Sequence, residues 1–225
     1  MRLRVCYGGT FDPVHNGHVA IACTVRDALT AEVRLIPAAD PPHKGEPHAD
    51  AGHRARMLEL AVAGQRGLAV DRRELCREGP SYTVDTLRGL RAELGDQVAM
   101  AWLIGSDSLA ELHTWHRWRE LFTYAHILAV ERSGSRVDAA SLGRDAPEVR
   151  IEIGPRWRPA EQLRASPAVG FAVLPLPRPR PESSTELRRR LVAGEPWQDW
   201  VSPAVAAYIG RHRLYATQPA RPAPL

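Results

Sequence analysis

Hydrophobic positions along this chain follow two alternating spacings, which predicts alternating strands and helices. Six short apolar runs lack the polar alternation of a half-exposed strand, so they are typical of strands buried on both faces. They cover residues 3–7, 33–36, 68–70, 98–104, 127–130 and 171–174. Strands of this kind pair in parallel and need helical crossovers to connect them.

Three stretches between the early strands have the spacing of amphipathic helices. Apolar residues recur there every three or four positions, and Gly95 ends the third helix. The apolar faces consist of Val19, Ala22 and Val25, then Met57, Leu58, Ala61 and Val62, then Val84, Leu87, Leu90 and Leu94. This order predicts an α/β fold in a single domain, with a Rossmann-like doubly wound parallel sheet and flanking helices.

Two further helices are indicated near the C-terminus. The segment SSTE at 183–186 reads as a capping box, and Gly194 closes the helix that it starts. Ser202 and Pro203 start another helix, which we expect to end at Gly210.

The remaining segments set the expected domain boundary. Residues 133–167 are rich in Gly, Pro, Arg and Ser, which predicts an extended surface insertion. Residues 216–225 hold no core-forming side chains and predict a disordered tail. We therefore expect one domain over residues 1–215.

Composition excludes several classes of protein. No apolar run approaches the roughly 20 residues of a membrane helix, and we expect no signal peptide. Cys6, Cys23 and Cys76 lack metal-binding spacing and are odd in number, so we expect reduced thiols and a cytoplasmic protein. The 30 Lys and Arg against 26 Asp and Glu give a net charge of +4. That charge favours an anionic substrate but is too weak to indicate nucleic-acid binding.

The segment GGTFDPVHNGH at 8–18 follows the first strand and predicts a phosphate site. A strand, a glycine turn and a helix start together direct backbone N–H groups at an anion. Gly8 and Gly9 permit an approach that a side chain would block. His15 and His18 lie three positions apart, so both can face the opening of the loop.

Two plainer interpretations of these histidines exist. They could be surface residues of a capping turn, although the glycine turn just before them argues against that. They could bind zinc, but no third ligand follows at a plausible spacing. We expect no metal to be held by these residues.

The same segment resembles the signature of the HxGH nucleotidyltransferase superfamily. Within it, further motifs resemble the bacterial nicotinate-nucleotide adenylyltransferases, which join nicotinate mononucleotide to the AMP of ATP in NAD synthesis. These motifs are IPAADPPHK (36–44), SYTVDTL (81–87), GSDSL (105–109), TWHRW (114–118) and SSTELR (183–188). They follow the family's order and spacing from residue 5 to about residue 215. The PPHK, SYT and TW segments distinguish this family within the superfamily.

The resemblance implies adenylyl transfer from ATP to nicotinate mononucleotide, with release of pyrophosphate. A phosphate monoester has a second pKa of about 6, so the nucleophile is already an anion and needs no general base. The site instead needs donors and cations that absorb phosphoryl charge. The residues implied for this role are His15, His18, Lys44 and Arg188. Mg²⁺ is expected as the counter-ion of ATP.

Other motif positions are implied to bind ATP. They are Gly8, Gly9, Thr10, Phe11, Gly105, Asp107, Arg132, Ser184 and Thr185. Plainer alternatives are a loop lysine for Lys44, a helix cap for Asp107 and a solvated basic helix face for Arg188. The chain departs from the family pattern at Glu182, where an apolar residue is usual, and at Ser133, where a proline is usual.

A third set is implied to bind the nicotinate nucleotide. It consists of Ser81, Tyr82, Thr83, Val84, Trp115 and His116. Trp115 matches the aromatic residue that stacks on the pyridine ring, although its helical spacing is also that of a core residue. Thr83 and backbone N–H groups near Val84 and His116 would hold the carboxylate. An amide would need an acceptor there, which favours the acid.

Two rival functions are weighed against this one. Another HxGH transferase, such as a pantetheine-phosphate adenylyltransferase, is disfavoured by the SYT, TW and PPHK segments. A non-catalytic nucleotide sensor is disfavoured because the phosphate-binding side chains are intact. The sequence indicates neither a nucleic-acid nor a membrane partner, and it does not reveal the oligomeric state.

Overall fold

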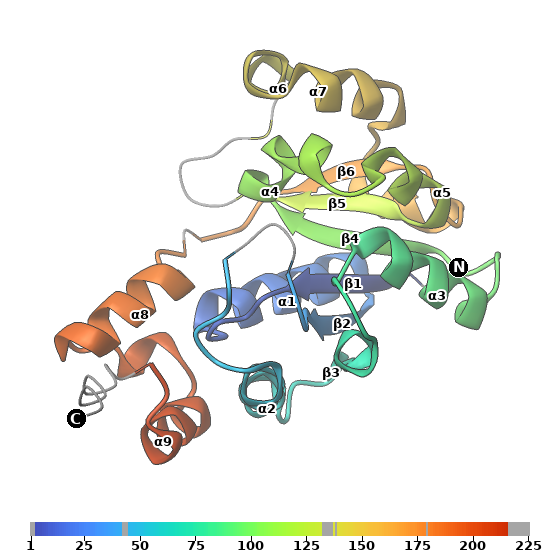
Figure 1. Ribbon diagram of the computed structural model, residues 1–225. Coiled ribbons are helices and arrows are strands. Elements are labelled where there is room, and N and C mark those ends of the chain that lie inside the picture. Colours follow the sequence, from blue (N-terminus) through green and yellow to red (C-terminus); the bar gives the residue numbers. More distant parts are fainter. Residues whose placement is uncertain (1–2, 42–44, 132–136, 138, 179, 216–225) are drawn as a thin grey trace, which may run out of the picture.

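A computed structural model of the chain describes residues 3–41, 45–131, 137, 139–178 and 180–215. These residues form a six-stranded parallel sheet with helices on both faces (Figure 1). The strands are β1 (Arg4–Gly9), β2 (Glu32–Pro37), β3 (Leu68–Val70), β4 (Met100–Gly105), β5 (His126–Val130) and β6 (Phe171–Leu174). Their order, β3-β2-β1-β4-β5-β6, is that of a doubly wound sheet, which confirms the predicted fold.

The helices connect these strands and extend beyond the last one. They are α1 (Asn16–Leu29), α2 (Ala51–Val62), α3 (Thr83–Leu94), α4 (Ser106–Ala110), α5 (Leu121–Tyr124), α6 (Ala139–Asp145), α7 (Pro147–Ile153), α8 (Ser184–Ala193) and α9 (Pro203–His212). In Figure 1, α6 and α7 lie beyond β5 and β6, whereas α8 and α9 lie at the other side of the molecule. Helix α9 packs against α2, so the C-terminal region returns to the N-terminal half.

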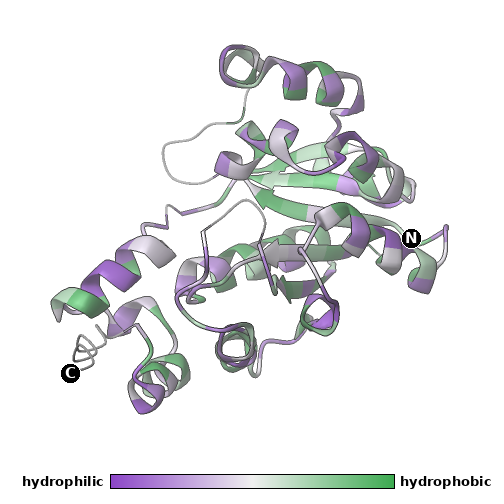
Figure 2. Cartoon of the chain, in the orientation of Figure 1, coloured by the Kyte–Doolittle hydropathy of each residue, from purple (hydrophilic) through white to green (hydrophobic). Residues whose placement is uncertain are grey.

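Two hydrophobic clusters fill the two faces of the sheet. Along β4, Ala101 and Leu103 belong to the cluster under α1, α2, α8 and α9, whereas Met100, Trp102 and Ile104 belong to the cluster under α3, α5 and α7. Successive side chains of a strand point to opposite faces, so a strand covered on both sides must be apolar throughout. Figure 2 shows the strands in green and mixed colours on the outer helices. This burial is the physical reason that the continuous apolar runs in the sequence predicted strands correctly.

The expected end of the last helix was wrong by two residues. Helix α9 continues through Gly210 to His212, and Arg213 ends it in the left-handed conformation, at φ 50°. The N–H of Arg213 donates to the carbonyls of Ile209 and Gly210, which closes the helix. Tyr215, two residues further on, is buried.

The segment 133–167 is more than a surface insertion. Its described part forms α6, α7 and two 3-10 turns, and it is the crossover between β5 and β6. Val149, Ile153 and Leu163 are completely buried there. Weak periodicity hid these helices because each is too short to repeat an apolar face. The expected tail at 216–225 lies outside the described residues.

Candidate active site

A cleft with a volume of about 460 Å³ opens at the carboxyl ends of β1 and β4. In an open α/β sheet, ligands bind at this edge, where the strand order reverses. Here β1 lies between β2 and β4, so the next crossovers leave to opposite sides. The sequence-predicted residues that line the cleft are Gly8, Gly9, Thr10, Phe11, His18, Ser81, Tyr82, Thr83, Gly105, Asp107, Trp115, His116, Ser184, Thr185 and Arg188. Gly8 and Arg188, 180 positions apart in the sequence, therefore meet in one cavity.

Of the other four predicted residues, the two that the structure describes, His15 and Val84, do not line the cleft. His15 is buried behind the lining at 2 % exposure, and the side chain of Val84 belongs to the hydrophobic core. Lys44 and Arg132 lie outside the described residues. Their implied roles stay predictions.

The glycines of the first loop are dictated by packing as well as by ligand approach. A Cβ at Gly8 would lie 2.1 Å from the ring of Trp102 on β4, which is far inside van der Waals contact. A Cβ at Gly9 would lie 3.0 Å from the ring of Phe11. The loop therefore lies directly against these two rings, with its backbone at the wall of the cleft.

His15 and His18 form one unit at the start of α1. The two rings are stacked, with centroids 3.7 Å apart and planes at 27°. The backbone N–H of His15 donates to Nδ1 of His18 over 3.2 Å. Because Nδ1 accepts this bond, neutral His18 carries its proton on Nε2 and can act as a donor there. His18 lines the cleft, so the fold sets which nitrogen is the donor.

Helix α8 brings Arg188 and Ser184 to the same loop. The Arg188 guanidinium donates to the carbonyl oxygen of Asp12 over 2.5 Å, and the Ser184 hydroxyl donates to that of Pro13 over 2.9 Å. Ser183 caps the helix by accepting from the N–H of Glu186, as the capping-box pattern predicted. The N-terminus of α8, a favourable site for an anion, therefore faces the first loop.

Glu182 replaces the apolar residue that is usual before the two serines. Glu182 is only 8 % exposed, and its carboxylate pairs with Arg180 at 2.8 Å. The ion pair allows a charged residue at this position, so α8 still starts against the first loop.

Asp12 connects the loop to two distant segments, a role that the sequence pattern did not predict. One carboxylate oxygen accepts from the N–H of His48 at 2.9 Å, and the other accepts from Ala49 at 3.2 Å. The second oxygen also accepts from the hydroxyl of Tyr215 at 2.9 Å. Asp12 is 5 % exposed, so these donors replace the water that a carboxylate needs.

Arg54 is a second residue that sequence reasoning missed. This side chain of α2 is 1 % exposed, and its guanidinium donates to four backbone carbonyls. The acceptors are Thr10 at 2.8 Å, Ala38 at 2.6 Å, Ala39 at 3.0 Å and Ala49 at 3.0 Å. Burial lowers the pKa of Arg54, partly offset by the charge of Asp12. A signal was present, since position 54 falls on the apolar face that Met57 and Leu58 define.

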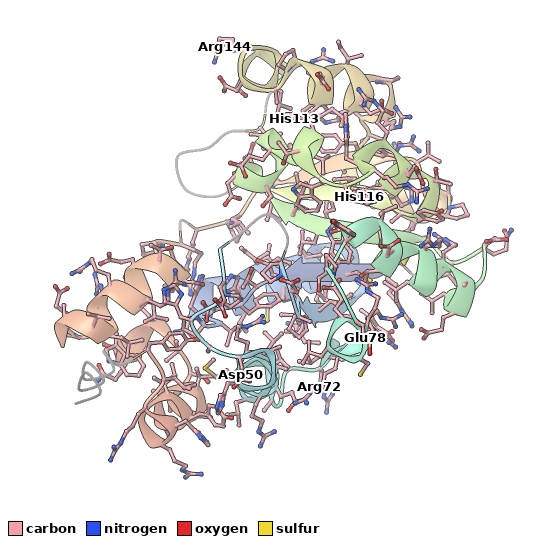
Figure 3. All side chains as sticks on the ribbon, viewed as in Figure 1. Asp50, Arg72, Glu78, His113, His116 and Arg144 are labelled. Carbon is pink, nitrogen blue, oxygen red and sulfur yellow. The ribbon has the colours of Figure 1, made fainter. Side chains whose placement is uncertain are left out.

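The opposite end of the cleft is lined by aromatic rings. The rings of Tyr82 and His116 stack with centroids 4.3 Å apart and planes at 28°. His116 comes from the segment between α4 and α5, where Figure 3 labels it, and it is exposed. Trp115 is half-buried beside it and packs on the core of the α3 face. Trp118 is 5 % exposed and is a core residue.

Ser81 has a structural contact that accounts for its position. Its hydroxyl accepts from the backbone N–H groups of Ala39 and Asp40, at 3.0 and 3.3 Å. Through these bonds, Ser81 joins the start of α3 to the loop after β2. These two segments, which both contribute residues to the lining of the cleft, are therefore held together by hydrogen bonds.

Glu74 is a buried acid at the wall of the cleft. It is 4 % exposed, and its carboxyl accepts from the hydroxyl of Thr86 at 2.6 Å. Burial raises the pKa of Glu74 above its usual value of 4.5, although the Thr86 hydrogen bond and the charge of Arg77 oppose the rise. Nothing in the apolar pattern around position 74 indicated this carboxyl.

Neither a metal site nor a membrane span is visible in the described ranges. Among these residues, no three His, Cys, Asp or Glu side chains lie close enough to hold a metal ion. No helix in the same ranges is both long and apolar enough to cross a bilayer.

Comparison with known proteins gives the class to which this fold and cleft belong. The profile of the cytidylyltransferase-like family matches residues 6–190, which is most of the chain. The protein is therefore a nucleotidyltransferase of the cytidylyltransferase-like family.

Curated relatives narrow this class. The chain is 49 % identical over 222 residues to the probable nicotinate-nucleotide adenylyltransferase of Stenotrophomonas maltophilia, covering 96 % of this chain and 97 % of that protein. It is 48 % identical over 214 residues to the protein of the same description from Chromobacterium violaceum, covering 93 % and 96 %. Within the class, the chain belongs to the nicotinate-nucleotide adenylyltransferase family.

Solved structures show the same fold at low sequence identity. The nicotinic acid mononucleotide adenylyltransferase of Plasmodium falciparum, complexed with NaAD, matches with a TM-score of 0.72. The match covers 96 % of this chain and 98 % of that one at 16 % identity. The same enzyme complexed with APC matches with a TM-score of 0.67.

Proposed function

We propose that this protein transfers the adenylyl group of ATP to nicotinate mononucleotide, giving nicotinate adenine dinucleotide and pyrophosphate in NAD synthesis. One observation carries the proposal: a single cleft joins a phosphate-binding loop to an aromatic wall. The loop would bind the triphosphate of ATP, and the aromatic wall would bind a flat pyridine ring. The names of the relatives at 49 % and 48 % identity support the same reaction.

The chemistry needs charge stabilisation more than acid–base catalysis. The acceptor phosphate is an anion near neutral pH and attacks the α-phosphorus of ATP directly. His18 would donate from Nε2 to the phosphoryl oxygens, where negative charge increases in the transition state. Arg188 and the N-terminus of α8 would bind the departing pyrophosphate. Because these groups are already held in place, no conformational entropy is lost in ordering them during the reaction.

His15 would support His18. Its ring stacks on that of His18, and its backbone fixes the tautomer of His18. We also propose that Thr10 and the backbone of Phe11 hold the phosphates. Gly105 and Asp107, at the end of β4, would contact a ribose.

The aromatic wall would select the acceptor. Trp115 would stack on the pyridine ring, and Thr83 lines the same cleft. Thr83 and the backbone N–H groups near Val84 and His116 would favour a carboxylate over a carboxamide, because the amide would leave a donor without an acceptor.

We expect Mg²⁺ to enter with ATP. The described residues provide no three-ligand cage for it, so the ion would be held chiefly by phosphate oxygens and water. We also propose that the protein works in the cytoplasm, because all three cysteines are free thiols.

The experiment that tests the function is a pyrophosphate-release assay. Purified protein is given ATP and Mg²⁺ with nicotinate mononucleotide, nicotinamide mononucleotide or pantetheine phosphate in parallel. The proposal predicts the highest kcat/KM with nicotinate mononucleotide. Release with pantetheine phosphate alone would assign a different transferase, and no release with any acceptor would favour a nucleotide sensor.

A further inference from the structure

Tyr215 lies in the last described turn of the chain and reaches the first loop. Its hydroxyl donates to Oδ1 of Asp12 over 2.9 Å, across 203 positions of sequence. Tyr215 is 9 % exposed and Asp12 is 5 % exposed. The contact is therefore an internal one that water does not replace easily.

The backbone around Tyr215 is held in an uncommon conformation. Arg213 and Tyr215 have φ values of 50° and 64°, in the left-handed region that non-glycine residues seldom adopt. The ring of Tyr215 belongs to the hydrophobic cluster under α1, α2, α8 and α9. Packing of the ring compensates for the backbone conformation and places the hydroxyl at Asp12.

The hydroxyl is a permanent donor in this setting. Burial, and then the negative charge of Asp12, raise the pKa of Tyr215 far above its usual value. The proton therefore stays on the tyrosine oxygen at every physiological pH, and the hydroxyl donates a hydrogen bond to the carboxylate of Asp12.

Asp12 also contacts residues that line the cleft. Arg188 donates to the carbonyl of Asp12, and its guanidinium lies 3.7 Å from the Asp12 carboxylate. The same carboxylate receives the backbone N–H groups of His48 and Ala49. Asp12, in the first loop, therefore contacts both Arg188 and Tyr215.

We propose that Tyr215 is a positioning residue for the adenylyl transfer, acting through Asp12 on Arg188 and the first loop. The proposal rests on the proposed function for its kinetic effect. Tyr215 does not line the cleft, so it would act without touching either substrate. The Tyr215 hydroxyl is one of two donors to Oδ1 of Asp12. Its loss would weaken the hold on this carboxylate and leave Arg188 less well aligned to the phosphates of ATP.

The test compares Tyr215→Phe with a matched control, Tyr208→Phe. Tyr208 is on α9 and also donates or accepts one 2.9 Å hydrogen bond, with Nδ1 of His53, but it does not line the cleft or contact the first loop. For Tyr215→Phe we expect kcat/KM for ATP to fall by about tenfold, with KM for nicotinate mononucleotide within about twofold of wild type. Tyr208→Phe should leave both constants unchanged.

A second readout does not depend on activity. Amide hydrogen exchange of the peptide that contains His48 and Ala49 reports the hydrogen bonds to Asp12. We expect faster exchange there in Tyr215→Phe and no change in Tyr208→Phe. Thermal unfolding of both variants shows how much of any effect is global.

Each outcome of these measurements supports or overturns the positioning role of Tyr215. An ATP-specific loss with faster local exchange, confined to Tyr215→Phe, supports the positioning role. Equal behaviour of the two variants, or equal losses for both substrates in step with a lower Tm, overturns it. If wild-type protein releases no pyrophosphate, the proposed function fails; unchanged exchange in Tyr215→Phe would then separately overturn the link through Asp12.

Discussion

The imidazole rings of His15 and His18 stack at 3.7 Å, and the backbone of His15 fixes the tautomer of His18. The buried histidine therefore orients the one that lines the cleft. The two histidines of the HxGH motif look equivalent in the sequence, but they occupy different environments in the structure. The ring of His18 lines the cleft, and the ring of His15 is buried against it.

Replacing His18 with alanine should lower kcat by about 10² to 10³, because a donor to the phosphoryl oxygens is lost. The fold should persist, since His18 is only partly buried. Steady-state kinetics and circular dichroism measure the two effects. His113→Ala is the control, because His113 is exposed and does not line the cleft (Figure 3). A His18→Ala enzyme with normal kcat would refute the assigned role.

Replacing Trp115 with alanine should raise KM for nicotinate mononucleotide by about tenfold, because the stacking surface for the pyridine ring is lost. The KM for ATP should change little. Initial rates with each substrate varied in turn provide the measurement. Trp157→Ala is the control, since Trp157 packs edge-on against Phe171 away from the cleft. Equal losses of affinity for both substrates would contradict the stacking role.

Replacing Arg54 with methionine should lower the free energy of unfolding by roughly 3 kcal/mol, because four backbone carbonyls lose their donor in a buried site. Arg54→Lys keeps the charge but cannot span these acceptors, so it should recover only part of the loss. Urea unfolding measures both variants.

The control for Arg54 lies on the same helix. Arg56 is exposed and pairs with Glu59 at 3.1 Å, so Arg56→Met should cost less than about 0.5 kcal/mol. Similar costs for the variants at 54 and 56 would show that the buried hydrogen bonds contribute little.

Glu74 should make the stability fall as pH rises. Its pKa is raised by burial above the value of 4.5 in the unfolded chain, so the folded state binds the proton more tightly. Its contribution is fully present below pH 4.5 and is lost as the pH passes through the raised pKa. Glu74→Gln cannot titrate, so its free energy of unfolding should improve relative to wild type as the pH increases.

Urea unfolding at a series of pH values from about 4 to 8 measures this trend. Glu78→Gln is the control, because Glu78 is exposed (Figure 3) and should follow wild type throughout. A difference between Glu74→Gln and wild type that stays constant, or that shrinks as pH rises, would contradict the raised pKa.

The apolar pattern by itself determined the six strands and the helices α1, α2 and α3. Continuous runs such as 127–130 had to be strands covered on both faces, because every side chain in β5 is buried. The motif GGTFDPVHNGH likewise located a loop that lines the cleft, since glycines and a helix start are local features. Local chemistry of this kind can be read along the chain.

Only the tertiary structure decided the contacts that cross the chain. Nothing near position 215 in sequence indicates a hydrogen bond to Asp12, and no pattern around Glu74 indicates a buried carboxyl. His15 and His116 each belong to a sequence motif, but the fold buries His15 and leaves His116 exposed. Hydrophobic periodicity encodes which face of an element is buried. It does not encode which distant polar group will meet that face, because that depends on how all the elements pack together.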